Sequence, residues 1–214
     1  MAKQEGVIKF DLDYTPGPPL PAHELDELNA WRTILYARKL IGQDPVRYGG
    51  YGYGNLSRRL TPFDAPPTQR RFVISGTQTG DLAELGPQHY ALVLGCEPER
   101  NRIVATGPIR PSSESLTHGA VYALDSRLRC VLHVHSPELW QHAAALGLPI
   151  TDPTVPYGSP EMAAEVGRLF AQTDVAARHL FSMGGHEDGI VAFGPTLQAA
   201  GDALLATLDA ITRL

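Results

Sequence analysis

Residues 130–137 have the sequence Cys130-Val131-Leu132-His133-Val134-His135-Ser136-Pro137. This pattern predicts a short buried strand that carries a His-x-His pair and is ended by Ser-Pro. Because side chains alternate between the faces of a strand, His133 and His135 share one face with Val131, and the other three strand residues share the opposite face. Two imidazoles on one face can supply two ligands to a metal. A catalytic metal usually takes three ligands from the protein, so the rest of the chain must supply a third.

The composition fits one sizeable globular domain or two small ones, with 214 residues of which 43% are hydrophobic. The net charge of -5 provides no basic face for nucleic acid. The two cysteines, Cys96 and Cys130, form neither a CxxC pair nor a disulfide framework. Residues 1–13 mix charged with apolar residues, unlike a secretory signal, and no apolar run is as long as a membrane span. We therefore expect a reducing, cytoplasmic setting.

The N-terminal part, residues 1–23, is predicted to be an arm that leads into a single domain formed by residues 24–214. The arm contains a predicted strand at residues 7–12, followed by a proline-rich stretch. Apolar residues at helical spacing then predict a helix over residues 23–41, with Gly42 as its C-terminal cap. We interpret this helix as one that covers the core and takes no part in chemistry.

A glycine-rich segment follows at residues 48–57, with the sequence YGGYGYGNLS. Glycines permit left-handed turns and let a ligand approach the backbone closely, so this segment is either a set of strong turns or a binding loop. Apolar runs predict further strands at residues 72–76, 92–94 and 102–106, and a turn joins the last two.

A helix is predicted to begin at Ser112 or Ser113, because serine is a favoured N-cap residue. The apolar residues on the predicted inward face of this helix continue to Leu124, and only Gly119 weakens the helical pattern. The N–H groups and the positive dipole end at a helix start suit an anion such as phosphate. Taken alone, however, plain capping explains the serines, and Glu114 is simply favourable in the first turn.

The C-terminal half alternates helices and strands. Helices are predicted at residues 137–146, 160–172 and 195–211, strands at 178–183 and 190–193, and a loop at 147–158. Several of the predicted strands are close enough in sequence to form hairpins. These elements favour an α/β or α+β sandwich with a mainly antiparallel sheet.

His186 is the best candidate for the third ligand. It lies among glycines at the start of a predicted strand, where a side chain can be directed at a neighbouring strand. Taken alone, a histidine in a loop is more often a surface residue. His118 follows Glu114 by four residues on the predicted helix, so it either supports the site or packs in the core.

Other folds that use a His-x-His pair fit less well. A metallo-β-lactamase site would continue with Asp-His, whereas Ser136-Pro137-Glu138 follows here. A cupin would be all-β, and the segment after Ser136 is predicted to be helical. A (β/α)8 amidohydrolase would place the pair near its first strand and needs roughly 250 residues.

In combination, these motifs resemble the class II aldolase/adducin family, which includes fuculose-phosphate aldolase, ribulose-phosphate 4-epimerase and methylthioribulose-phosphate dehydratase. The resemblance spans about residues 24–211. It rests on five motifs in the order of the family: the glycine–asparagine phosphate loop at 54–57, a small-residue turn at 74–76, the serine–glutamate helix start at 110–114 with His118 and Tyr122, the metal strand at 133–137, and His186 followed by Gly189.

The resemblance implies a three-layer α/β/α sandwich with a mainly antiparallel central sheet, and a homotetramer with its site at a subunit boundary. It implies a divalent metal, usually Zn²⁺, held by His133, His135 and His186. It implies that Glu114 is the acid/base and a candidate fourth ligand when no substrate is bound. The implied phosphate pocket is formed by Asn55, Ser75, Gly76, Ser112 and Ser113.

The implied activity is that of a lyase, a metal-dependent aldolase acting on a small ketose that we expect to be phosphorylated. It would cleave or form a carbon–carbon bond through an enediolate stabilised by the metal as a Lewis acid. A carboxylate close by moves the proton, which is typically worth ~10²–10⁴-fold in rate. The alternatives are a sugar-phosphate 4-epimerase or dehydratase on the same scaffold, or a non-catalytic adducin-like binding module.

Glu187 and Asp188 depart from the family pattern, because they separate the third histidine from a glycine that usually follows it directly. They either compensate for an acid that the epimerases use or are solvated charges of a loop. We favour the second interpretation, which predicts that both side chains lie in solvent.

Overall fold

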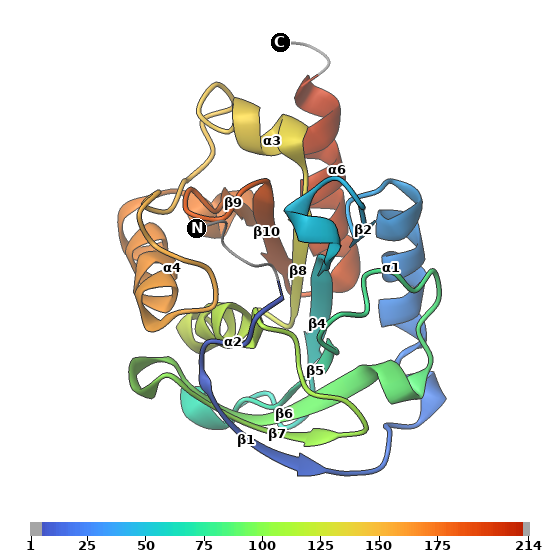
Figure 1. The fold of residues 1–214 in the computed structure, drawn as a ribbon. Helices are drawn as coiled ribbons and strands as arrows, with labels where there is room; N and C mark the ends of the chain where they lie inside the picture. The colour runs from blue at the N-terminus through green and yellow to red at the C-terminus, as the bar shows by residue number, and fades with distance from the viewer. Residues whose placement is uncertain (1–5, 212–214) are drawn as a thin grey trace.

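The computed structural model describes residues 6–211 (Figure 1). Its strands are β1 (Asp11–Pro16), β2 (Gly42–Gln43), β3 (Gly52–Tyr53), β4 (Asn55–Arg59), β5 (Phe72–Ser75), β6 (Tyr90–Glu97), β7 (Arg102–Gly107), β8 (Cys130–His135), β9 (Leu180–Ser182) and β10 (Gly189–Gly194). Its α-helices are α1 (Asp26–Ala37), α2 (Ser115–Leu124), α3 (Pro137–His142), α4 (Pro160–Gln172), α5 (Val175–Arg178) and α6 (Leu197–Ile211). Short 3₁₀ helices are η1 (Ala22–Glu24), η2 (Tyr48–Gly50), η3 (Pro67–Gln69), η4 (Pro87–His89) and η5 (Pro98–Arg100).

Eight strands form one sheet in the order β1-β7-β6-β5-β4-β8-β10-β9. Neighbouring strands of this sheet are antiparallel, except for the edge pair β1 and β7, which is parallel. The strands β2 and β3 make a separate antiparallel pair. The mainly antiparallel sheet expected from the sequence is therefore confirmed, and β8 lies inside it between β4 and β10.

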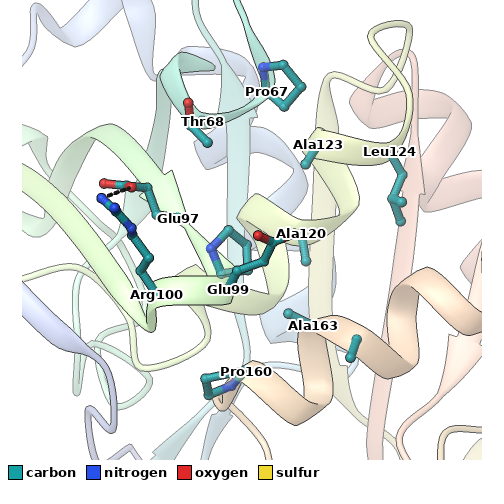
Figure 2. Close-up of a pocket in the computed structure, with 12 residues that line it drawn as sticks. Pro67, Thr68, Glu97, Glu99, Arg100, Ala120, Ala123, Leu124, Pro160 and Ala163 are labelled. Atoms are coloured by element: carbon teal, nitrogen blue, oxygen red, sulfur yellow. Dashed lines mark hydrogen bonds and ion pairs between the residues drawn. The ribbon is translucent and has the colours of Figure 1, made fainter.

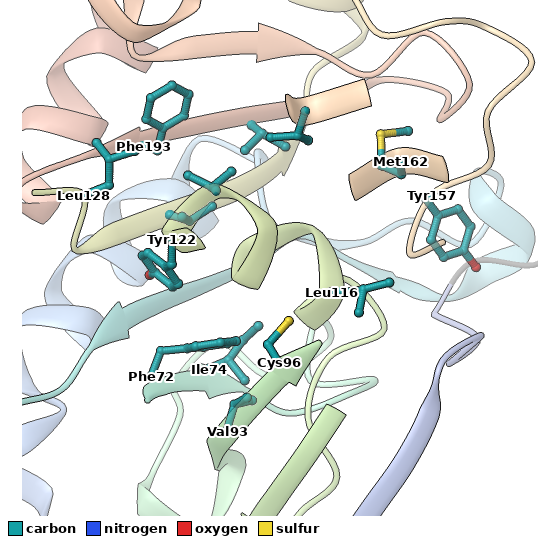
Figure 3. Close-up of a cluster of buried hydrophobic side chains, with 14 of the residues drawn as sticks. Phe72, Ile74, Val93, Cys96, Leu116, Tyr122, Leu128, Tyr157, Met162 and Phe193 are labelled. Atoms are coloured by element: carbon teal, nitrogen blue, oxygen red, sulfur yellow. The ribbon is translucent and has the colours of Figure 1, made fainter. Parts of the chain in front are cut away.

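Helices cover both faces of the sheet, which gives three layers (Figure 1). On one face Leu116 of α2 and Met162 of α4 belong to one buried cluster (Figure 3). Val131 of β8 belongs to the same cluster. On the other face Leu28 of α1 and Leu204 of α6 pack with the alternate residues of β8. The predicted alternation along this strand is confirmed. Burying one such apolar side chain stabilises the fold by ~1.5–3 kcal/mol relative to leaving it exposed.

The first helix is shorter than the sequence predicts, because α1 ends at Ala37 and Gly42 is not its cap. The chain leaves the helix at Lys39, which has a left-handed φ of 58°. The carbonyl of Leu40 then accepts the backbone N–H of His135 at 2.9 Å. Since this bond draws the chain to the end of β8, the helix cannot continue, and Gly42 instead pairs with Tyr53 in β2 and β3.

The helix predicted to begin at Ser112 or Ser113 begins at Ser115, with Glu114 in the N-cap position. A turn precedes it, in which the Ser112 carbonyl accepts the N–H of Ser115 at 3.1 Å and Ser112 Oγ accepts the N–H of Glu114 at 3.3 Å. Ser112 therefore shapes this turn and does not cap the helix.

Other differences concern the ends of elements and the glycine-rich segment. The second half of that segment is not a turn but the start of β4, a strand of the main sheet. The N-terminal strand lies at Asp11–Pro16 instead of residues 7–12, α3 ends at His142, and α6 begins at Leu197. The helix α4 has the predicted bounds, and Ser159 Oγ caps it by accepting the N–H of Met162.

Candidate metal and catalytic site

Three histidines converge at one end of β8. The nitrogen atoms of His133, His135 and His186 that could bind a metal all lie within 4.8 Å of one another. The ring centroids are 4.8–5.0 Å apart, and all three residues are buried. His186 lies in the turn between β9 and β10, and the antiparallel register places Gly189 opposite His135. That register brings the turn, and with it the third histidine, to the pair on β8.

His133 shows which of its nitrogens is available to a metal. Its Nδ1 lies 3.2 Å from the backbone carbonyl oxygen of Ile190. A carbonyl can only accept, so Nδ1 carries the proton and Nε2 keeps a lone pair. His133 Nε2 is buried and has no hydrogen-bond partner among the described residues. A histidine ligand held through its other nitrogen in this way is the usual arrangement at metal sites.

Burial keeps two of these imidazoles neutral. Desolvation is the main reason that the pKa values of His133 and His135 lie well below 6.5, and the neighbouring histidines lower them further. A metal binds the neutral form of imidazole. Three buried imidazoles with one carboxylate at hand are a donor set that fits a catalytic zinc ion.

Glu114 is the carboxylate beside the histidines. It is 1% exposed, and its Oε1 lies 3.7 Å from Nδ1 of His186. Its other oxygen, Oε2, accepts a hydrogen bond of 2.7 Å from Thr117 Oγ1, one turn further along α2. Thr117 therefore fixes the carboxylate, and apart from its spacing of three residues no sequence signal indicated this role.

Aromatic side chains enclose the histidines, and the sequence analysis assigned none of them to the site. The ring of Tyr157, from the loop before α4, stacks on His186 with centroids 4.5 Å apart. Tyr48 meets His135 edge-on at 4.6 Å, and Tyr53 lies 5.3 Å from the same ring. These contacts restrict the rotation of the imidazoles and keep water from their faces.

The residues predicted to bind phosphate gather in one polar depression, with one exception. Asn55, Gly76, Ser112 and Ser113 line it together with Gly6. Ser75 is buried elsewhere, where its Oγ accepts the backbone N–H of Leu56 and joins β5 to β4. The depression holds about 20 Å³, room for about one water molecule. A phosphoryl group would therefore require the walls to move apart.

The segment before β1 runs across this region. Thr77 Oγ1 donates to the carbonyl of Gly6 at 3.3 Å, and the N–H of Val7 donates to the hydroxyl of Tyr157 at 3.3 Å. Lys9 Nζ donates to the carbonyl of Tyr157 at 3.0 Å and lies over its ring. The predicted arm thus contacts both walls of the candidate site, whereas its status as a separate unit stays a prediction.

A buried polar chain lies behind the histidines. Ser57 Oγ is 2.7 Å from Nδ1 of His118 and 2.7 Å from the hydroxyl of Tyr122. All three residues are fully buried, and burial lowers the pKa of His118 to about 3. His118 is therefore neutral at physiological pH and links α2 to β4. Of the two roles predicted for it, support of the site and packing in the core, the structure shows the second.

Of the two acidic residues between His186 and Gly189, only one is solvated. Glu187 is exposed as predicted, whereas Asp188 is 3% exposed. The interpretation of both as solvated loop charges is therefore wrong for Asp188. Its carboxylate is buried because Tyr48 and Arg47 donate hydrogen bonds to it.

A larger cavity lies away from these residues. It holds about 510 Å³ and lies between α2, α4 and the segment around η5 (Figure 2). Ala120, Ala123 and Ala163 form its apolar wall, while Glu97 and Arg100 pair with each other at its rim. None of the candidate site residues lines this cavity, so we do not regard it as the active site despite its size.

Comparisons with known proteins identify the family and the fold of the chain. The family described as "Class II Aldolase and Adducin N-terminal domain" matches residues 46–211. No curated protein sequence matches the chain. Within residues 6–211, no helix has both the length and the apolar character that a membrane crossing requires.

Several solved structures share the fold. The chain is 19% identical to YgbL from Escherichia coli, whose activity is given only as aldolase/epimerase/decarboxylase, with a TM-score of 0.61 over 90% of this chain and 88% of that one. The sugar-phosphate aldolase from Thermotoga maritima is 14% identical, with a TM-score of 0.64 over 89% and 93% of the two chains. L-fuculose-1-phosphate aldolase from Thermus thermophilus is 20% identical, with a TM-score of 0.56 over 90% and 89%.

Proposed function

Because the chain belongs to the class II aldolase and adducin N-terminal domain family, we propose that it is a metal-dependent aldolase. Its substrate would be a small, phosphorylated ketose, in which the enzyme cleaves or forms a carbon–carbon bond. The observation that carries the proposal is the buried carboxylate of Glu114, 3.7 Å from one of three converging histidines. A scaffold without catalysis would have no need to keep these four groups together in the core.

His133, His135 and His186 would hold a divalent metal, and zinc suits their three nitrogen donors best. Such an ion, when bound, supplies a Lewis acid that stabilises negative charge on substrate oxygens. The histidines orient it, and the rings of Tyr48 and Tyr157 shield the site from water.

Glu114 would move the proton. Its Oε2 is fixed by Thr117, which leaves Oε1 directed to the side of His186. A carboxylate within reach of the reacting carbon or of the substrate hydroxyl can take a proton in one direction of the reaction and return it in the other. The burial of Glu114 excludes bulk water from this exchange.

The polar depression would bind the phosphate. Asn55, Ser112 and Ser113 offer uncharged donors there, and Gly76 forms part of the lining. We include Ser75 in the proposal because it adjoins Gly76. Binding energy from a phosphate remote from the reacting atoms can be used to orient them. We further propose a homotetramer and a cytoplasmic location, the latter because Cys96 and Cys130 are buried free thiols.

Two measurements test the proposal. Elemental analysis should find about one zinc or similar ion per chain, lost in His186→Ala and retained in His142→Ala, a histidine on α3 outside the cluster. No metal in the wild-type protein after zinc is added back would refute it. Product analysis with a panel of sugar phosphates then identifies the reaction: a triose with an aldehyde supports the aldolase, whereas an isomeric or dehydrated sugar assigns the same residues to an epimerase or dehydratase.

A further inference from the structure

Asp188 has an unusual place in the turn that carries His186. It is 3% exposed and has a left-handed φ of 62°. The turn is closed by a hydrogen bond of 2.9 Å from the N–H of Gly189 to the carbonyl of His186. Aspartate tolerates this backbone conformation better than most residues, but nothing in the turn itself requires the carboxylate to be buried.

The carboxylate binds a distant part of the chain. Asp188 Oδ2 accepts a hydrogen bond of 2.6 Å from the hydroxyl of Tyr48 and one of 2.9 Å from Nη2 of Arg47. The Arg47 side chain is 41% exposed, so the pair lies at the boundary of the core. Burial, followed by the bond to Asp188, raises the pKa of Tyr48 above 10, which keeps its hydroxyl a donor.

These bonds link the turn of His186 to the surroundings of His135. The ring of Tyr48 packs edge-on against His135, with centroids 4.6 Å apart. The backbone carbonyl of Asp188 accepts the N–H of Ser136, the residue directly after His135, at 2.8 Å. Through its backbone and its side chain, Asp188 therefore connects the turn of His186 both to the end of β8 and to the aromatic ring that faces His135.

We infer that Asp188 is a positioning residue for the candidate metal site. Its carboxylate clamps Tyr48 against His135 and fixes the turn of His186, so that two ligands from separate strands keep one geometry. The inference rests on the proposed metal site and adds to it a residue that contacts no metal itself. Groups that orient metal ligands from outside typically contribute roughly 10–100-fold to metal affinity.

The experiment measures Zn²⁺ affinity of the full chain by competition with a chromophoric chelator, and the visible spectrum of the Co²⁺-substituted protein. Asp188→Gly removes the carboxylate while glycine accepts the left-handed backbone without strain. Asp188→Asn keeps an acceptor for Tyr48, and Tyr48→Phe removes the donor but keeps the ring. Glu187→Ala is the matched control, because it alters the exposed acid of the same turn.

We expect Asp188→Gly to weaken Zn²⁺ binding by roughly 10–100-fold and to change the Co²⁺ spectrum. Tyr48→Phe should do the same to a smaller extent, Asp188→Asn should restore most of the affinity, and Glu187→Ala should bind like the wild type. Wild-type affinity and spectrum in Asp188→Gly, or in Tyr48→Phe should the glycine variant not fold, overturn the inference and leave the proposed function intact. A wild-type protein that binds no Zn²⁺ overturns both.

Discussion

Acidification tests the buried chain formed by His118, Ser57 and Tyr122. In the folded protein, burial holds the pKa of His118 at about 3 instead of 6.5. In the unfolded chain the same imidazole takes up a proton near pH 6.5. Between these two values the unfolded state binds more protons than the native state, so the free energy of unfolding falls as the pH falls. The stability is fully present above pH 6.5 and is lost progressively toward pH 3.

The size of the effect follows from the shift. A difference of one pKa unit corresponds to about 1.4 kcal/mol, so His118 alone removes about 2 kcal/mol between pH 6.5 and pH 5. Over the whole window the loss is about 5 kcal/mol. The net stability of a domain is typically ~5–15 kcal/mol, which means that this one histidine contributes substantially to acid denaturation.

Urea unfolding followed by circular dichroism, at pH values from 7.5 to 5 and with a chelator present, measures the effect. His118→Asn is the comparison, because an amide can still bond to Ser57 but does not titrate. His133 and His135, whose pKa values burial also lowers, are present in both proteins and cancel in the difference. We expect the variant to lose about 2 kcal/mol less than the wild type over this range. Parallel pH dependences of the two proteins would refute the reasoning.

Three further predictions concern the proton, the phosphate and the packing of α2. Glu114→Gln should lower kcat by ~10²–10⁴-fold while the metal content is unchanged, because the amide cannot take the proton; full activity would exclude Glu114 as the acid/base. Asn55→Ala should raise KM for a phosphorylated sugar more than it lowers kcat, and an equal effect on the dephosphorylated sugar would contradict a phosphate contact. Gly119→Ala should lower the free energy of unfolding by ~1–3 kcal/mol, because a Cβ there would lie 2.2 Å from Cys96 Sγ. Gly167→Ala on α4, where a Cβ meets nothing within 4 Å, is its control and should be neutral or stabilising by up to ~1 kcal/mol in the same urea titration.

The face of β8 that carries the histidines was predictable, because a period of two is a local property. Val131, His133 and His135 alternate with apolar residues, and no other part of the chain is needed to place them together. The N-cap of α4 was predictable for the same reason, because Ser159 bonds to Met162, only three residues further along the chain. Gly119 shows the limit of such reasoning. Within α2 it only weakens the helix pattern, whereas the structure shows that a larger residue would collide with Cys96 of β6.

The strand β4 was missed because its residues are polar and follow glycines. Its Arg59 is fully buried in the sheet, against the usual preference of arginine for solvent. The guanidinium is held there by the carbonyls of Ser126 and Phe63, at 3.0 and 2.8 Å. Phe63 is a local partner, but Ser126 lies 67 residues further along the chain, and a single sequence does not reveal such a contact, which can override local propensity.

The burial of Asp188 was missed for the same reason, because its partners stand about 140 residues earlier in the chain. Although two acidic residues separate His186 from Gly189, the turn still directs this histidine towards β8. Two consecutive turns, from Met183 to His186 and from His186 to Gly189, take up the extra length, and the N–H of Met183 bonds to the carbonyl of Gly189 across their base. Beyond these turns, β10 pairs with β8 with Gly189 opposite His135. Asp188 adds a buried carboxylate that bonds to Arg47 and to Tyr48, whose ring packs on His135. One of the two residues that depart from the family pattern therefore connects the turn of His186 to the surroundings of His135.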